Sequence, residues 1–173
     1  VAMLKLDNKT WKRFRVGDIF DISTGANITS KELENGVIPR ITAKDTNNGI
    51  DQFTNRLGVR NFRTNKKCVS VSFLGSCFYQ DVEASFDMKI HSITPKGDVS
   101  FNRYSGLFVV NQCKMQFTKF SYGNQLSSTD LPRQYITLPV TEQGLPDWEY
   151  MEEYMRLKEK QILKPTIEKL CKQ

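Results

Sequence analysis

Two sets of side chains in this sequence have the types that perform catalysis. Asp87-Met88-Lys89 and Pro146-Asp147 contain the residue types of a metal-dependent nuclease core. They occur in the wrong order for such a core, and Asp147 stands where a helix needs an acceptor for its first N–H groups. His91, the single histidine, would have to be the base for a cysteine or serine nucleophile. Alternating residues around it predict a strand, so we interpret His91 as passive.

Cofactor and metal signals are equally weak. Cys68, Cys77, Cys113 and Cys171 are scattered without a C-x-x-C pair, which argues against a zinc site. A DNA methyltransferase would need a glycine-rich cofactor turn and an Asn/Asp-Pro-Pro-aromatic tetrapeptide, and the sequence has neither. We therefore predict a non-enzymatic protein without cofactor or metal, with reduced thiols in a cytoplasm. No apolar run approaches the ~18–20 residues of a membrane helix.

Recognition chemistry is better represented. Arginine reads guanine, asparagine and glutamine read adenine, hydroxyls read either, and lysine and arginine hold phosphates. These types are concentrated in two polar loops, 40–48 and 122–133, and in the basic stretch between 56 and 67. The predicted DNA contacts are Arg40, Thr42, Lys44, Asn47, Asn48, Arg60, Arg63, Lys66, Lys67, Tyr122, Asn124, Gln125, Ser127, Ser128 and Arg133. We expect Arg40→Ala and Lys44→Ala to weaken DNA binding without loss of the fold.

The charge distribution agrees with a polyanion ligand. The chain of 173 residues carries a formal charge of +6 with a pI near 9.1. Residues 1–140 hold 19 Lys and Arg against 12 Asp and Glu, whereas residues 141–173 hold 6 against 7. The basic excess therefore lies in the part that precedes residue 141, as in a nucleic-acid-binding domain.

Local patterns predict the elements that position these loops. Asn102 is a cap candidate for a core helix over 103–117, and Cys68–Tyr79 alternates as a hairpin does. The remaining expectations are a helical turn and then a strand within Trp11–Ser23, a brief helix at Lys31–Asn35, and strands at Val37–Thr42, Phe86–Thr94 and Gln134–Val140. The Asn-Gly pair at 48–49 predicts a tight turn.

A C-terminal helix is expected from Asp147 to about Leu163, where Pro165 should kink or end it. Its apolar stripe is wider than a small domain needs. We predict that Trp148, Met151, Met155 and Ile162 pair with another helix, the alternative being that they pack on their own domain.

Several motifs resemble those of one family. The segment from Tyr122-Gly123 through Ile136-x-Leu138-Pro139 to the turn Gly144–Trp148 resembles the target-recognition domain of the specificity (S) subunit of Type I restriction-modification systems and of related fused Type II enzymes. Trp11, Phe14, Val16, Asp18, Ile19, Phe20 and Gly25 resemble the family's opening segment, and Ile38-Pro39-Arg40-Ile41 resembles its IPyI element. The family often has a basic residue where this chain has Asn124.

The resemblance implies an α+β fold with twisted, mainly antiparallel sheets. It divides the chain into a recognition domain, 1–144, and a helical spacer region, 145–173. It further implies a non-catalytic subunit that reads one half of a bipartite site in double-stranded DNA and positions modification (methyltransferase) and restriction subunits. The chain would be either a half-subunit that pairs as a homodimer through its C-terminal helix, or a fragment of a longer protein. A general nucleic-acid binder and a helix-mediated assembly protein remain alternatives.

Overall fold

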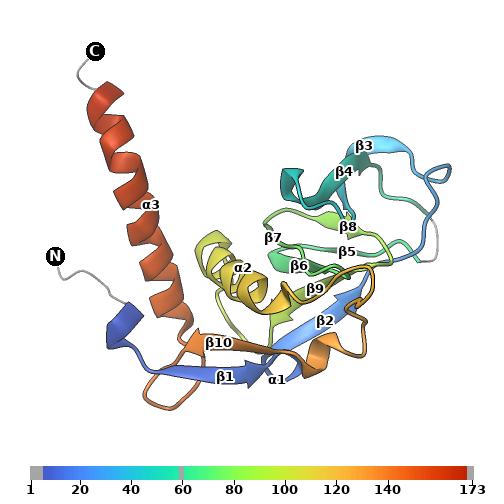
Figure 1. The fold of residues 1–173 in the computed structure, drawn as a ribbon. Coiled ribbons are helices and arrows are strands. Elements are labelled where there is room, and N and C mark those ends of the chain that lie inside the picture. The colour runs from blue at the N-terminus through green and yellow to red at the C-terminus, as the bar shows by residue number, and fades with distance from the viewer. Residues whose placement is uncertain (1–5, 59–60, 171–173) are drawn as a thin grey trace.

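The computed structural model describes residues 6–58 and 61–170, which form three small sheets and three α-helices (Figure 1). One sheet pairs β1 (Trp11–Arg15) with β10 (Tyr135–Pro139) in antiparallel register. This pairing joins the two ends of the domain. A short 3-10 turn, η1 (Leu6–Asn8), precedes β1, and another, η3 (Leu131–Arg133), precedes β10.

The central sheet is antiparallel throughout. Its strand order is β2 (Phe20–Thr24), β9 (Ile90–Pro95), β6 (Cys68–Ser72) and β7 (Cys77–Gln80). The predicted hairpin is confirmed, because Cys68 pairs with Gln80 and Val71 with Cys77. The one strand expected over 86–94 is two strands, since residues 87–89 turn between β8 and β9.

The third sheet also has four strands and lies above the central one in Figure 1. Its order is β4 (Ile50–Thr54), β3 (Asn35–Ile41), β8 (Ala84–Phe86) and β5 (Thr64–Asn65). Only the β3–β8 pairing among these strands is parallel. The turn η2 (Asn47–Gly49) connects β3 to β4. The brief helix expected at 31–35 is absent. Glu32 instead closes a turn on Thr29: its N–H donates to the Thr29 carbonyl at 3.0 Å, and its carboxylate accepts from the Thr29 backbone N–H and hydroxyl.

Helix α2 (Arg103–Phe117) covers the inner faces of β7 and β10, and its predicted bounds are confirmed. Asn102 caps it by accepting from the Tyr104 and Ser105 N–H groups, and the Asn102 N–H donates in turn to Ser105 Oγ. The segment Trp11–Ser23 has β1 first, then α1 (Val16–Ile19), then β2. Gly25 ends β2 where any side chain would collide, since a Cβ there would lie 2.1 Å from the Asp87 carbonyl oxygen.

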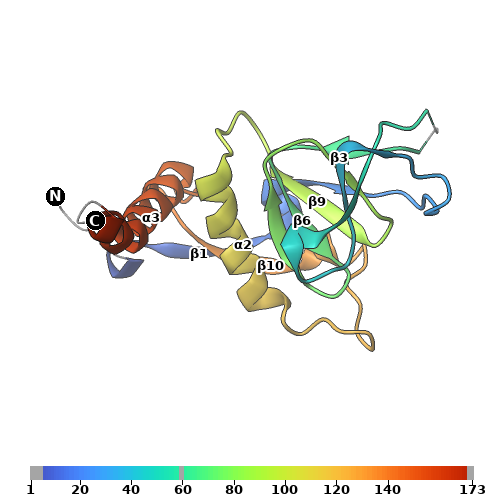
Figure 2. The same cartoon turned by 90° about the horizontal axis from the view of Figure 1, so that it is seen from above.

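Helix α3 (Trp148–Leu170) forms the arm, packing on α2 near its start and then projecting from the body (Figures 1 and 2). Asp147 caps it, as predicted, with its carboxylate accepting from the Tyr150 N–H at 3.1 Å. Pro165 lies within the helix and does not end it. The missing proline N–H removes one hydrogen bond, which the helix tolerates here. The α+β class with mainly antiparallel sheets is confirmed.

Candidate nucleic-acid interface

The first predicted loop is held rigidly on the central sheet. Asn47, Asn48 and Gly49 have φ values of 49°, 57° and 76°, so three successive residues adopt the left-handed conformation. Asn48 donates its side-chain amide to the Tyr79 carbonyl at 3.2 Å and to the Gln80 side chain at 3.1 Å. The Asn48 amide therefore holds the turn, while Asn47 remains exposed beside it.

Arg40 does not belong to an exposed surface, and its assignment as a DNA contact is wrong. Its side chain is 2% exposed. One guanidinium nitrogen donates to Ser85 Oγ and the Phe86 carbonyl, both at 2.8 Å, and the other donates to the Ala26 carbonyl at 2.9 Å. Burial lowers the pKa of Arg40, and Asp87 nearby partly opposes that shift. Arg40 joins β3, β8 and the end of β2.

Two of the other described cations of this region pair with carboxylates. Lys44 is exposed and lies 2.5 Å from Asp51, and Arg56 pairs with Glu83. Arg63 is exposed and donates to the Thr24 carbonyl at 2.9 Å. Lys66 and Lys67 are exposed at the turn that enters β6, Thr42 is half-buried at the end of β3, and Arg60 lies outside the described residues.

The second loop is an ordered turn system with exposed polar side chains. Ser121 and Asn124 exchange backbone hydrogen bonds at 3.0 Å, and Leu126, fully buried, donates its N–H to the Phe73 carbonyl. Ser127 is used internally, since its hydroxyl accepts from the Asp130 N–H at 3.1 Å. The members that remain exposed are Tyr122, Asn124, Gln125, Ser128 and Arg133.

The structure separates the two loops. Asn48 is bonded to Gln80, which pairs with Cys68, so the first loop and Lys66–Lys67 share one end of the β6–β7 hairpin. Leu126 is bonded to Phe73 at the other end of that hairpin. The five residues of β6 extend about 17 Å at ~3.4 Å per residue. The predicted contacts therefore form two groups, not one.

The prediction omitted a third basic surface. Arg13 and Arg15 on β1 are exposed and pair across the sheet with Thr137 and Tyr135, while Phe14 and Ile136 between them face the core. We call Arg13, Arg15, Tyr135 and Thr137 the β1–β10 outer face. The alternation Arg-Phe-Arg is a strand signal that could have revealed these residues, had this segment not been interpreted as a helical turn.

Most of the arm residues that we expected to pair with another helix pack against their own domain. Trp148 packs edge-on against Phe20 and Phe101 with ring centroids 6.0 and 5.8 Å apart. Met151 is fully buried, and Met155 packs on the main core. The first half of helix α3 therefore packs on its own domain, which was the alternative to pairing. Ile162 is 73% exposed, and Leu163 and Ile167 are also exposed.

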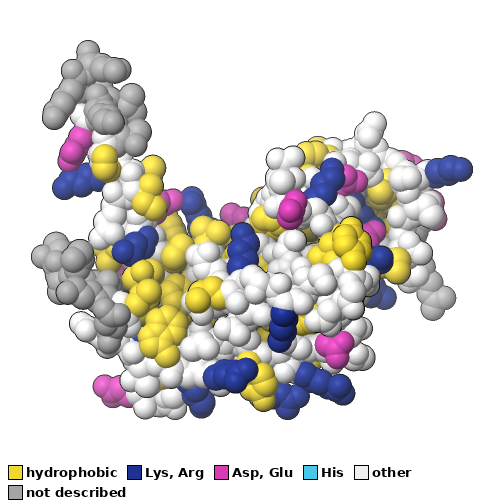
Figure 3. All heavy atoms as spheres, viewed as in Figure 1, with side chains coloured by type: hydrophobic (Ala, Val, Ile, Leu, Met, Phe, Trp, Pro, Cys, Tyr) yellow, Lys and Arg dark blue, Asp and Glu magenta, His cyan; other side chains and the backbone are white. Residues whose placement is uncertain are grey.

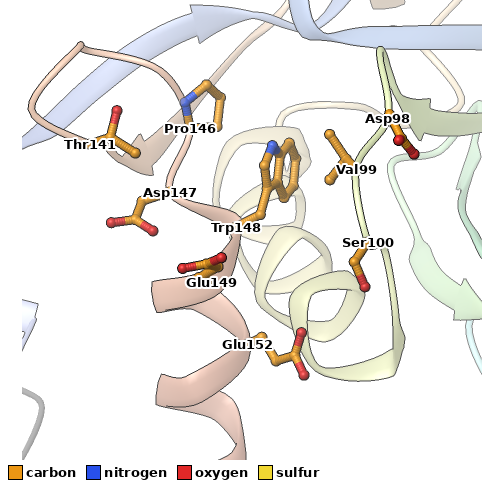
Figure 4. Close-up of a pocket in the computed structure, with 9 residues that line it drawn as sticks. All are labelled: Asp98, Val99, Ser100, Thr141, Pro146, Asp147, Trp148, Glu149 and Glu152. Carbon is orange, nitrogen blue, oxygen red and sulfur yellow. The ribbon is translucent and has the colours of Figure 1, made fainter.

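A depression of about 410 Å³ lies at the base of the arm (Figure 4). Its walls come from the loop 98–100, the loop 141–147 and the first turns of α3. Carboxylates of Asp98, Asp147, Glu149 and Glu152 line it. A negatively charged site repels phosphates, so the depression is not part of a DNA-facing surface.

Among the described residues no group of three or more His, Cys, Asp and Glu side chains could hold a metal ion. The described helices also include none with the length and apolar character of a membrane span.

His91 is a buried structural residue. Its side chain is 3% exposed, and Nδ1 lies 3.0 Å from Thr24 Oγ1. Burial lowers the pKa of His91 below its ordinary value, although a hydrogen bond with the Leu126 backbone opposes the shift.

The three described cysteines, Cys68, Cys77 and Cys113, are buried free thiols, and burial raises the pKa of Cys68 to about 12. None of these groups resembles an activated nucleophile.

The His91 shift predicts a pH dependence of stability. As pH falls below about 6.5, the unfolded chain binds a proton at this residue before the folded chain does. The free energy of unfolding should therefore decrease between about pH 7 and pH 5, and His91→Gln should remove that part of the slope. Urea denaturation of both chains across this range measures the difference, and identical slopes would contradict it.

The comparisons with known proteins agree with one another. The model of the family described as Type I restriction modification DNA specificity domain matches residues 8–168. A Type II restriction enzyme specificity subunit from Heyndrickxia coagulans is 32% identical over 167 residues, covering 95% of this chain and 48% of that protein. The chain therefore spans about half the length of this curated relative.

Solved structures share the fold. The S subunit of a Type I restriction-modification system from M. genitalium matches with a TM-score of 0.61 and 14% identity over 82% of this chain and 38% of its own. The HsdS subunit from Thermoanaerobacter tengcongensis matches with a TM-score of 0.60 and 16% identity over 88% and 38%. With the family match over nearly its whole length, the chain belongs to the Type I restriction-modification DNA specificity domain family.

Proposed function

We propose that this chain is a non-catalytic DNA-recognition domain that reads one half of a bipartite site in double-stranded DNA. The observation that carries the proposal is the family match over residues 8–168. The structure adds an ordered loop that presents Tyr122, Asn124, Gln125 and Ser128, side chains suited to base edges. The rigid anchoring of that loop through Leu126 favours a preformed reading surface.

The same proposal assigns partners to the rest of the molecule. A recognition domain of this family would position modification and restriction subunits on DNA, and residues 145–173 would be the spacer that sets their geometry. Such a chain works in a cytoplasm and needs no cofactor of its own. The division at residue 144 is part of this proposal, since α3 begins at Trp148 and leaves the body beyond its first turns.

The outer part of the arm supports pairing with another helix. Ile162 and Leu163 form, with Tyr104, Leu107 and Met155, the apolar part of a groove of about 180 Å³ between α2 and α3. Arg103, Lys158 and Glu159 also line this groove. Leu163 and Ile167 are four residues apart and share a helix face. We take a second copy of α3 as the occupant, because a two-fold pair would match a two-fold symmetric split site.

Selection against a randomised duplex library tests the function. We expect the 173-residue chain, at low and moderate salt, to enrich a motif of a few fixed base pairs, with a mirrored second half if the arms pair. Asn124→Ala combined with Gln125→Ala should relax that motif, at a cost of about 1–3 kcal/mol of discrimination per lost base contact.

Two outcomes would contradict the proposal. Salt-sensitive binding without enrichment, repeated with a methyltransferase subunit present, would favour a general nucleic-acid binder. Absence of binding with and without that subunit would favour a helix-mediated assembly protein.

A further inference from the structure

The β1–β10 outer face and the neighbouring turn η3 present exposed cations. Arg13, Arg15 and Arg133 are all exposed, and none forms an ion pair with a carboxylate of the described residues. Lys and Arg side chains gather along the lower edge of the molecule, over β1, α1 and η3 (Figure 3). At the other end of the domain, Lys44 and Arg56 are compensated by Asp51 and Glu83, whereas Arg63, Lys66 and Lys67 are exposed without an ion pair among the described residues.

The arrangement of this face is regular. Arg13 and Arg15 are two residues apart on one strand, which places them about 6.8 Å apart along it at ~3.4 Å per residue. One strand of duplex DNA carries a phosphate about every 3.4 Å of helix axis. Two such arginines can therefore serve two phosphates of the same strand.

An aromatic side chain orders one of the arginines. The Arg13 guanidinium lies over the Tyr135 ring, 4.6 Å from its centroid, and Tyr135 is itself paired with Arg15 across the sheet. A guanidinium stacked on a ring is held in place while its N–H groups stay free for a phosphate. The strand pairing beneath it is rigid, because Phe14 and Ile136 anchor the two strands in the core.

The outer face is continuous with the second loop. That loop ends in η3, where Arg133 is exposed, and Tyr135 follows two residues later. η3 is fixed against the start of α1, since Val16 donates its N–H to the Gln134 carbonyl at 2.8 Å. The first loop, at the far end of the β6–β7 hairpin, has no such connection.

We infer that the DNA backbone next to the bases read by the second loop lies across the β1–β10 outer face, where Arg13 and Arg15 hold its phosphates. The inference rests on the proposed function and deepens it, because it selects the β1–β10 outer face over the basic surface at the first loop. These residues position the duplex and read no sequence.

The test is the salt dependence of duplex binding by the 173-residue chain, measured by fluorescence anisotropy. Arg13→Gln with Arg15→Gln should weaken binding about tenfold, equally for related and unrelated sequences. The slope of log K against log salt should become shallower by about 1.8, at ~0.9 per phosphate. Arg13→Lys with Arg15→Lys keeps the charge and should restore most of that slope.

A matched control removes two exposed charges from the arm, Lys160→Gln with Lys164→Gln, and should leave both values unchanged. Thermal melting of all variants shows that the fold is intact. If the unmodified chain binds duplexes but Arg13→Gln with Arg15→Gln keeps the same slope, the inference fails and the proposed function stands. That result would assign the face to an acidic protein partner. If the unmodified chain binds no duplex with or without a methyltransferase subunit, both fail.

Discussion

Replacing Arg40 by alanine is expected to lower the free energy of unfolding by about 3–5 kcal/mol, as for breaking a buried charged network. The guanidinium bonds three acceptors on two segments, Ala26 after β2 and Ser85 and Phe86 on β8. Without it, buried polar atoms that now accept charged hydrogen bonds would lose them. The loss should appear as a lower midpoint in urea denaturation.

The Arg40→Lys variant separates the stabilising effect of the hydrogen-bond network from that of the positive charge alone. A lysine ammonium is a compact donor and cannot reproduce the planar fork that reaches Ala26 and Ser85 together. We therefore expect Arg40→Lys to destabilise the domain substantially as well.

Lys44→Ala is the matched control, because Lys44 is exposed and its partner Asp51 is also exposed. It should change stability by no more than about 0.5–1 kcal/mol. An Arg40→Ala protein as stable as Lys44→Ala would contradict the buried network. DNA-binding data for Arg40→Ala are interpretable only alongside this stability, since unfolding alone would abolish binding.

Arg40 also shows where sequence reasoning reaches its limit. It stands in a basic stretch, and arginine is rarely buried unless it is paired, so its type and neighbours predicted exposure. Its acceptors are carbonyls and a hydroxyl from segments distant in sequence, at 26 and 85–86. The residues next to Arg40 in the sequence do not indicate these acceptors, because every residue type has a backbone carbonyl.

Elements governed by local signals were predicted well. The bounds of α2 follow from the Asn102 cap and its apolar spacing, and the β6–β7 hairpin follows from alternation over consecutive residues. The β1–β10 pairing joins opposite ends of the domain, so the strand at 11–15 had no neighbouring partner in the sequence to indicate it. Missing that strand also concealed Arg13 and Arg15.

The second loop is an intermediate case. Its residue types identified it as a polar, exposed segment, and the structure places most of its members at the surface. Which hydroxyls and amides also form hydrogen bonds within the loop could not be predicted. Ser127 bonds Asp130 and Asn124 donates to the Lys119 carbonyl at 3.2 Å, contacts that depend on how tightly the turn closes.

The other large effect is expected within helix α3, where periodicity placed Met151 and Ile162 on one stripe. Met151 is fully buried in the main core, so Met151→Ala should lower the free energy of unfolding by about 2–5 kcal/mol. Met115 on α2 is 69% exposed and gives a matched control of the same side chain. Met115→Ala should stay within about 0.5 kcal/mol of the unmodified protein. Equal losses in the two variants would show that the base of the arm is not packed as described.

Ile162 and Ile167 lie on the part of the arm that leaves the body, and both are exposed. Ile162→Ala with Ile167→Ala should therefore leave the stability of the single chain nearly unchanged, because neither side chain fills its core. If α3 pairs with a second copy, the same variant should shift sedimentation equilibrium from dimer toward monomer, because the apolar surface buried between the helices is lost. A chain that sediments as a monomer before any substitution, or a dimer that the variant leaves intact, would contradict pairing through the outer turns of α3. If the arms do pair, helix α3 serves two purposes: its first turns complete the recognition domain, and its outer turns set the distance to a second recognition domain.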